Sequence, residues 1–413
     1  MFRPIILSAA LLAVLRALGP FSTQTTGSAD LKAAIDSFLD RRVATDSFSG
    51  AVLVAKNGRI AYQRAAGIAD RQSGAPMTIE TRLQIASTTK LFTQIAIRQL
   101  EQAGKLSLSD TVGKFLPNYP NAVVRSKVTI EQLLRHQSGV GSFWNERYMA
   151  HHAEVRSVND YLELFQNDSL LFEPGSSEAY SNGGYVLLGA IIERVSGKSY
   201  HDYLRERVFA PAGMTETAPY NRRVPLKNAA VGYTTQMLDG PMPGDRRLAG
   251  PGGSRPGNAP VTSAAVLTPT TGNGARLRIM GADGRVLGDP EAREAVARRA
   301  TSGAARRPNT DIQPGMSSPA GDHYSTVGDF LKLANALTSH RLLDSLHTAA
   351  LLGTRYSSGN DFRANGGGPG VNAEFSIYPS GDVLVVLSNY DPPAATAVAQ
   401  YVRSLIASPA TAR

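Results

Sequence analysis

Short apolar segments flank turn-forming residues near both ends of the chain. The first pair surrounds Asn57-Gly58, and the second surrounds Pro379-Ser380-Gly381-Asp382. Asn-Gly between two apolar segments is the strongest short-range signal for a β-hairpin, and a longer turn with Gly is also common in hairpins. We therefore predict two hairpins, with strands at Gly50–Ala55, Arg59–Tyr62, Ala373–Tyr378 and Val383–Ser388.

Helical spacing of apolar residues accounts for most of the remaining pattern. Leu31, Ile35, Phe38 and Leu39 fall on one side of a helix over Leu31–Arg42. The other predicted helices are Thr88–Ala103, Ile130–His136, Val158–Phe165, Tyr185–Val195, Tyr200–Val208 and Ala394–Ile406. Strands at both ends with helices between them indicate an α+β fold, in which the two ends of the chain complete one antiparallel sheet flanked by helices.

Two segments differ from this pattern. Arg3 precedes an apolar run, Pro4–Leu15, that is too short to cross a bilayer. We interpret residues 1–30 as a signal peptide and leader without a clear A-x-A cleavage site, an amphipathic helix being the alternative. We therefore expect a periplasmic or secreted protein with no stable membrane span. The segment at about 237–308 opens with many Gly and Pro residues, and we interpret it as an insertion into one domain, residues 31–413.

Composition narrows the chemistry. The 413 residues are 42% hydrophobic, which suits a globular core, and include no cysteine. Disulfides, thiolate nucleophiles, cysteine-ligated zinc and iron–sulfur clusters are therefore excluded. The net charge of +9 arises largely between Asp239 and Thr310, where 11 Arg stand against 6 acidic residues. No basic run interleaved with aromatic residues occurs elsewhere, so we do not expect nucleic acid as a partner.

Ser87-Thr88-Thr89-Lys90 is the most informative short motif. Ser87 lies at the start of the predicted helix, where the helix dipole favours negative charge on its hydroxyl. Lys90 follows one turn later on the same face, and a desolvated lysine amine can act as a base. By itself the pattern also suits a helix-capping serine followed by a surface lysine.

Two further elements add to this motif. Tyr180-Ser181-Asn182 precedes a predicted helix and offers a phenol suited to proton transfer and an amide suited to orienting a substrate or the lysine. The glycine cluster at 365–370 precedes a predicted strand, and its backbone N–H groups could form half of an oxyanion hole. Alone, each element is equally compatible with a turn. His151 and His152 are adjacent without a third ligand, so we expect no metal site and no cofactor.

In this order and over this span, the three elements resemble the serine β-lactamase and penicillin-binding-protein superfamily, in particular its class C-like hydrolases and esterases. The resemblance also covers Gly104–Asp110, Leu133–Gly139, Phe172–Gly175, Pro211–Met214 and Ser325–Phe330. It implies an antiparallel sheet with an all-helical subdomain and a site between them. It further implies that Ser87 forms an acyl-enzyme, that Lys90 and Tyr180 move the proton, and that Asn182, Asn365, Gly366 and Gly367 bind the substrate.

The third motif of this chain departs from the family pattern. A Lys or His usually opens that motif, but here the tripeptide is Ala364-Asn365-Gly366 or Asn365-Gly366-Gly367. The family's cation holds a substrate carboxylate, and only a shift in register would bring Arg363 into its place. We therefore expect the protein to hydrolyse a small ester or amide, and we expect esterase activity above all. The alternatives are a β-lactamase or D-amino-acid peptidase and, from another class, a non-catalytic binding homologue.

Overall fold

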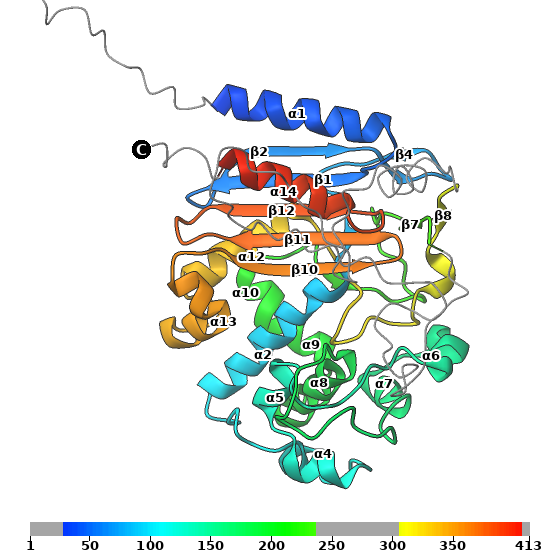
Figure 1. Ribbon diagram of the computed structural model, residues 1–413, viewed down its shortest axis with the longest axis vertical. Coiled ribbons are helices and arrows are strands. Elements are labelled where there is room, and N and C mark those ends of the chain that lie inside the picture. Colours follow the sequence, from blue (N-terminus) through cyan, green and yellow to red (C-terminus); the bar gives the residue numbers. More distant parts are fainter. Residues whose placement is uncertain (1–27, 237–304, 407–413) are drawn as a thin grey trace, which may run out of the picture.

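The computed structural model describes residues 28–236 and 305–406. Its centre is a five-stranded antiparallel sheet in the order β10-β11-β12-β1-β2 (Figure 1). The strands are β1 (Gly50–Lys56), β2 (Arg59–Ala66), β10 (Phe362–Gly368), β11 (Val371–Ile377) and β12 (Val383–Ser388). Both predicted hairpins are confirmed, and β1 pairs with β12 in register from Gly50↔Ser388 to Ala55↔Val383. The two ends of the chain therefore complete one sheet, as the pattern predicts.

Helices cover both faces of this sheet, and this explains why every residue of β12 is buried. On one face lie α1 (Ser28–Ala44) and α14 (Ala394–Ile406), whose apolar residues pack on Val52 and Val386. On the other face lie α12 (Val327–Thr338) and α13 (Ser345–Ser357). The sequence analysis predicted α1 and α14 but missed α12, α13 and β10.

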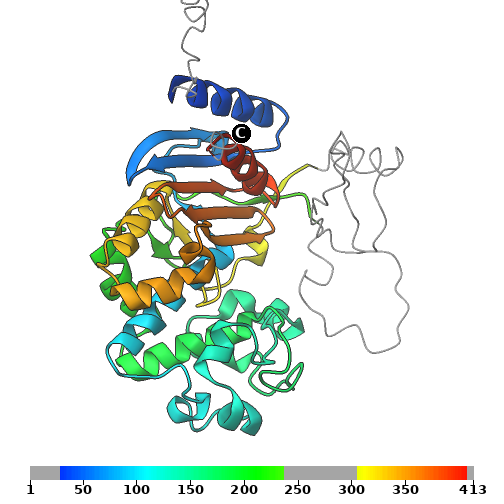
Figure 2. The same ribbon diagram turned by 60° about the vertical axis from the view of Figure 1, so that its left-hand side comes forward.

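An all-helical subdomain lies beyond β10, the strand at the edge of the sheet (Figures 1 and 2). Its helices are α3 (Val112–Phe115), α4 (Ala122–Lys127), α5 (Ile130–Leu134), α6 (Glu146–His151), α7 (Val158–Glu163), α8 (Asn182–Ser196) and α9 (Tyr200–Leu204). The helix α2 (Lys90–Gln102) contacts α8 on one side and α13 on the other, so it connects the two parts. The predicted fold class is confirmed.

Short strands complete the fold around the sheet. They are β3 (Ile68–Asp70), β4 (Ala75–Pro76), β5 (Leu83–Gln84), β6 (Ala218–Pro219), β7 (Tyr233–Thr234), β8 (Arg307–Pro308) and β9 (His323–Ser325). Because β7 pairs with β8, the end of the first described range, at residue 236, lies close to the start of the second, at residue 305. Most of the predicted insertion, from 237 to 304, and most of the predicted leader, from 1 to 27, lie outside the described residues.

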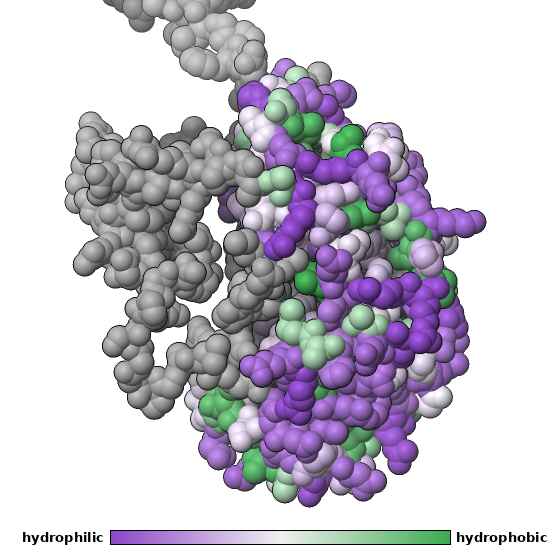
Figure 3. Space-filling view, turned by 90° about the vertical axis from the view of Figure 1, so that its right-hand side faces the viewer, coloured by the Kyte–Doolittle hydropathy of each residue, from purple (hydrophilic) through white to green (hydrophobic). Residues whose placement is uncertain are grey.

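The surface facing the viewer in Figure 3 is mainly hydrophilic among the described residues, with hydrophobic side chains in small groups. None of the helices within 28–236 and 305–406 combines the length and apolar character needed to cross a bilayer.

Two buried imidazoles predict how the stability of the fold depends on pH. The rings of His201 in α9 and His323 in β9 lie 5.3 Å apart, and His323 is fully buried. Burial lowers the pKa of His201 to about 4 and lowers the pKa of His323 well below its usual value. In the unfolded chain both imidazoles take up protons below a pKa of about 6.5, so stability decreases as the pH falls from that value towards the folded pKa.

We expect His201 to reduce the free energy of unfolding by about 2 kcal/mol between pH 7.5 and pH 5, and we expect His323 to add to this loss. Urea denaturation of the wild type and of the variant carrying His201→Phe and His323→Phe would measure this effect. The variant should show a clearly smaller loss over that pH range. An equal loss in both proteins would mean that the imidazoles do not titrate on unfolding.

Candidate active site

A sharp turn presents Ser87 to the space between the sheet and the helical subdomain. The turn is the 3₁₀ helix η1 (Ala86–Thr89), which lies between β5 and α2. Ala86 has a φ of +43°, a left-handed conformation that costs a residue other than Gly about 1–3 kcal/mol. The predicted helix over Thr88–Ala103 thus begins with η1, and α2 proper begins at Lys90.

The amine of Lys90 lies directly behind Ser87. Lys90 is only 6% exposed, and its Nζ donates hydrogen bonds to Ala320 O at 2.6 Å, Asn182 Oδ1 at 2.8 Å and Ser87 Oγ at 3.2 Å. Burial lowers the pKa of Lys90, although the nearby Tyr180 and Asp322 partly oppose this shift. The amine is therefore easier to deprotonate than a lysine in water.

The Tyr180 hydroxyl also reaches Ser87, from a position close to the Lys90 amine, which lies 4.8 Å from the centre of the Tyr180 ring. Its hydroxyl donates to Ser87 Oγ at 2.6 Å, while 55% of the residue is exposed. His136 holds the backbone on both sides of Tyr180, because Ala179 N donates to the His136 carbonyl at 3.0 Å and Ser181 N donates to His136 Nδ1 at 3.1 Å. Burial lowers the pKa of His136 to about 4, so the ring is neutral and Nδ1 can accept.

Asn182 is the first residue of α8 and bridges Lys90 to the helical subdomain. The Ser181 hydroxyl caps α8 by accepting from Gly184 N at 2.8 Å. This cap sets the start of the helix, and the Asn182 carboxamide then accepts from Lys90 and donates to Ser142 Oγ at 3.4 Å. The structure therefore brings Ser87, Lys90, Tyr180 and Asn182 together, as the sequence predicted.

Most of the glycine cluster belongs to the edge strand β10, which ends at Gly368, and Pro369-Gly370 forms the turn to β11. In β10, Gly366 lies against η1 so closely that an added Cβ would be 2.2 Å from the carbonyl oxygen of Ile85. Gly367 lines the pocket beside Ser87. A side chain at either position would therefore disturb the surroundings of Ser87.

The prediction that Asn365 binds substrate does not agree with its position. Neighbouring residues of a strand point to opposite faces of the sheet, so Asn365 points away from the face on which Gly366 meets η1. With its nitrogen facing the carboxylate, the Asn365 amide donates to Glu374 Oε2 at 3.2 Å. Arg363 shares that far face, and its Nε donates to Asp361 Oδ2 at 2.7 Å. It does not replace the cation of the family's third motif.

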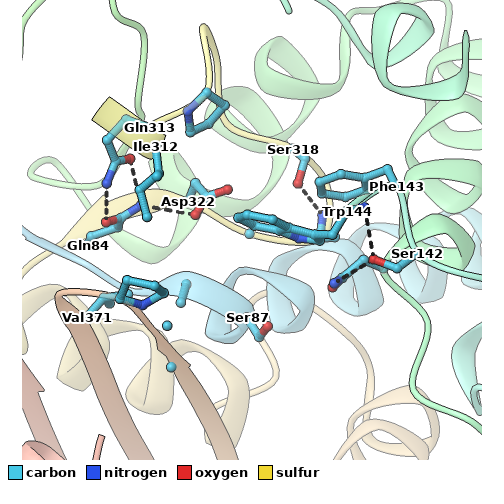
Figure 4. A pocket seen from close by; sticks show the side chains of 18 of the residues that line it. Gln84, Ser87, Ser142, Phe143, Trp144, Ile312, Gln313, Ser318, Asp322 and Val371 are labelled. Atoms are coloured by element: carbon cyan, nitrogen blue, oxygen red, sulfur yellow. Dashed lines mark hydrogen bonds between the residues drawn. The ribbon is translucent and has the colours of Figure 1, made fainter. Parts of the chain in front are cut away.

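A cavity of about 300 Å³ opens over Ser87 (Figure 4). Among the described residues that line it there is no Lys, Arg or His, and Asp322 is the one carboxylate. Gln84 Nε2 donates to Asp322 Oδ1 and to Gln313 Oε1, each at 3.0 Å. No local sequence pattern marks Gln84, Gln313 or Asp322, so these three residues were not predicted to belong to the site.

Gly366→Ala tests the close approach of β10 to η1. The added Cβ would lie 2.2 Å from Ile85 O and 2.9 Å from Thr88 Oγ1, so the strand and the turn must separate. We expect the free energy of unfolding in urea to fall by about 1–3 kcal/mol. The control is Gly328→Ala in α12, where the nearest atom to the added Cβ is 3.8 Å away. Equal stability of the two variants would contradict this account.

Comparison with known proteins supports the same family as the motifs. The family model described as Beta-lactamase matches residues 35–403. Penicillin-binding protein 4* of Bacillus subtilis (strain 168) is 38% identical over 192 residues, which are 45% of this chain. The matched region spans 42% of the length of that relative, less than half.

Solved structures agree at the level of the fold. A penicillin-binding protein from Bacillus halodurans, 25% identical, has a TM-score of 0.63 with 89% of this chain and 98% of its own chain covered. The D-amino acid amidase from Ochrobactrum anthropi SV3, 24% identical, also has a TM-score of 0.63, with 92% of this chain and 98% of its own covered. Since the family model spans most of the sequence, the resemblance is confirmed: this chain belongs to the serine β-lactamase and penicillin-binding-protein superfamily, a family of serine hydrolases.

Proposed function

We propose that this protein is an esterase-type acyl hydrolase that forms an acyl-enzyme on Ser87. The observation that carries the proposal is the hydrogen-bonded set at Ser87 Oγ, where the Lys90 amine lies 3.2 Å away and the Tyr180 hydroxyl 2.6 Å away. An alcohol is a weak nucleophile unless a base within hydrogen-bond reach takes its proton. Both groups are within that reach, one buried and one open to the pocket.

In the first step, Ser87 Oγ attacks the carbonyl carbon of the ester while its proton passes to the neutral Lys90 amine. The carbonyl oxygen becomes an oxyanion, which the backbone N–H groups of Ser87 and Gly367 would hold. The carbon–oxygen bond to the alcohol then breaks, and the proton passes through the Tyr180 hydroxyl to the departing oxygen. The exposed position of Tyr180 suits this role, because the alcohol must leave towards solvent.

The second step repeats the same chemistry with water. A water molecule attacks the acyl-enzyme and gives a proton to the Lys90–Tyr180 pair. The pair returns a proton to Ser87 Oγ as the acyl–oxygen bond breaks and the carboxylic acid leaves. Asn182 accepts a hydrogen bond from Lys90 in the present arrangement and keeps the amine near Ser87 while it changes charge. In this proposal Lys90 and Tyr180 act in both steps, as base and then as acid.

The charge of the pocket favours an ester without a carboxylate. No cation lines the cavity among the described residues, and the Asp322 carboxylate would repel a substrate anion. A β-lactam or a peptide with a free carboxy-terminus would therefore bind less well than a neutral ester. The leader expected at residues 1–30 is the basis for placing this activity in the periplasm or outside the cell.

A β-lactamase or D-amino-acid peptidase is the second candidate. Its support is the name of the relative, penicillin-binding protein 4*, together with the amide group of substrates in this superfamily. Turnover of nitrocefin faster than that of p-nitrophenyl acetate would favour this candidate. A well-folded wild type that a fluorophosphonate probe fails to label would favour a binding protein without turnover.

Substitutions at the three central residues test the mechanism directly. With p-nitrophenyl acetate, we expect Ser87→Ala and Lys90→Met each to reduce kcat/KM about 1000-fold or more, because the two residues act as one unit. The double variant should be no worse than Ser87→Ala alone. Tyr180→Phe should cost about 100-fold, the usual contribution of a proton-transfer group.

The matched control is Lys114→Met, which removes an exposed lysine paired with Asp110 in the helical subdomain. It should leave kcat/KM and the circular dichroism spectrum unchanged. Full activity in Lys90→Met, with the fold preserved, would exclude the amine as the base.

The lowered pKa of Lys90 predicts where activity is lost in acid. The amine must be neutral to take the serine proton, so kcat/KM for a neutral ester should fall as the pH decreases through the pKa of Lys90. Because burial lowers that pKa, the midpoint should lie below the ordinary lysine value of 10.5. A midpoint at or above 10.5 would contradict the assignment.

A pH profile of Asp322→Asn provides the control for this measurement. Burial raises the pKa of Asp322 to about 6, so its carboxyl group could also produce a decrease in activity in acid. If Lys90 is responsible, the decrease persists in Asp322→Asn and moves to lower pH, since the Asp322 charge raises the Lys90 pKa. Loss of the decrease would assign it to Asp322.

A further inference from the structure

Asp322 is a carboxylate held at the wall of the active-site cavity by an unusual backbone. It precedes β9 and has a φ of +74°, which is uncommon for a residue other than Gly. Gln84 Nε2 donates to Oδ1 at 3.0 Å, and Gln84 is itself held by reciprocal amide hydrogen bonds with Gln313 at 3.0 Å. The direction of the Asp322 side chain is therefore well defined.

The second oxygen of Asp322 is available to a ligand. Across residues 28–236 and 305–406, no hydrogen-bond donor and no ion-pair partner is found for Oδ2. Figure 4 shows one carboxylate oxygen directed to Gln84 and the other directed away from it. A half-buried carboxylate with an unused oxygen at the wall of a cavity is suited to a donor or a cation brought by the substrate.

The negative charge of Asp322 has no fixed counter-ion in the pocket. The nearest basic group, Lys90, gives its hydrogen bonds to Ala320, Asn182 and Ser87 rather than to Asp322. Burial also lowers the pKa of Lys90, so the amine is a weak counter-charge. Burial raises the pKa of Asp322 only to about 6, which leaves it ionised at neutral pH. A cationic ligand would add to the partial compensation that Lys90 gives this charge.

Aromatic rings complete the surroundings of this carboxylate. Phe143, Trp144 and Tyr180 line the same cavity, and the rings of Phe143 and Trp144 are stacked at 5.9 Å. The faces of aromatic rings attract cations, and sites that bind quaternary ammonium ligands commonly use such rings. A cavity lined by a carboxylate and several aromatic rings is typical of a site that binds an ammonium group.

We propose that Asp322 is a specificity-determining residue that binds an ammonium group of the substrate, so that the preferred substrates are esters or amides bearing a positive charge. The inference rests on the proposed acyl hydrolysis at Ser87 and names its substrate class. The hydrolysis itself is unchanged: the ammonium group takes no part in bond breaking, and Asp322 acts by placing the carbonyl carbon near Ser87 Oγ.

The test uses pairs of substrates that differ in charge but not in shape. One pair carries the charge on the acyl group: p-nitrophenyl 4-(trimethylammonio)butanoate and its carbon analogue p-nitrophenyl 5,5-dimethylhexanoate. The other carries it on the alcohol: acetylcholine and 3,3-dimethylbutyl acetate. A quaternary ammonium keeps its charge at every pH, so the ratio of kcat/KM within a pair measures recognition of charge alone.

In the wild type we expect the cationic member of at least one pair to have a kcat/KM about tenfold higher or more. In Asp322→Asn that ratio should fall to about one, because the isosteric amide removes the charge and Asn tolerates the same positive φ. Any effect of Asp322 on Lys90 changes kcat/KM equally for both substrates of a pair, so the ratio of the two values is unaffected. The control is Asp311→Asn, which removes an exposed neighbouring carboxylate that does not line the cavity and should leave the ratio unchanged.

Two outcomes would overturn the proposal: ratios near one in the wild type for both pairs, or a cationic preference that survives Asp322→Asn. Either result, if the neutral esters are hydrolysed and the activity disappears in Ser87→Ala, refutes the role of Asp322 but not the proposed function. If no ester is hydrolysed and a fluorophosphonate probe does not label the wild type, the proposed function itself fails.

Discussion

The burial of one lysine amine is the constraint on which the site depends. Lys90 is nearly inaccessible, and its three acceptors come from three separate parts of the chain: Ser87 from η1, Asn182 from the start of α8, and Ala320 from the segment before β9. Removing an amine from water without such hydrogen-bond partners would cost free energy, and keeping it fully ionised in the same place would cost more. The fold thus provides an amine that is held in place by hydrogen bonds and is also easier to deprotonate than in water.

The edge of the sheet provides the second requirement, a backbone that lies against the serine turn. Glycine at 366 allows β10 to approach η1 within a distance that any side chain would prevent. Ala86, with its left-handed backbone, makes the turn that directs Ser87 into the cavity. The strained turn and the glycine strand support one another, because the strand packs against the residues on either side of Ser87. The sheet and the helical subdomain therefore meet at the point where chemistry is expected.

The active-site cavity contains a negative charge, whereas the third motif of the family usually supplies a positive one. The side of β10 that packs on η1 presents Gly366, and the basic residue of that strand, Arg363, lies on the other side and is ion-paired with Asp361. The cavity instead contains Asp322, which lies 43 residues before Asn365, the first residue of the glycine cluster. Substitution of a cation by an anion at the wall of a pocket changes which substrates are attracted without altering the serine, the lysine or the tyrosine.

Sequence by itself determined much of this protein. Local patterns were sufficient for the hairpins β1–β2 and β11–β12, for α1 and α14, and for the order of motifs that identified Ser87, Lys90, Tyr180 and Asn182, because turns, amphipathic faces and short motifs are encoded by neighbouring residues. Tertiary structure alone decided that residues 365–368 of the glycine cluster belong to an edge strand, since glycine-rich segments carry no apolar alternation to mark them. It also decided that Asn365 points to Glu374 and that Asp322 enters the cavity, because both depend on pleat and on contacts between distant segments.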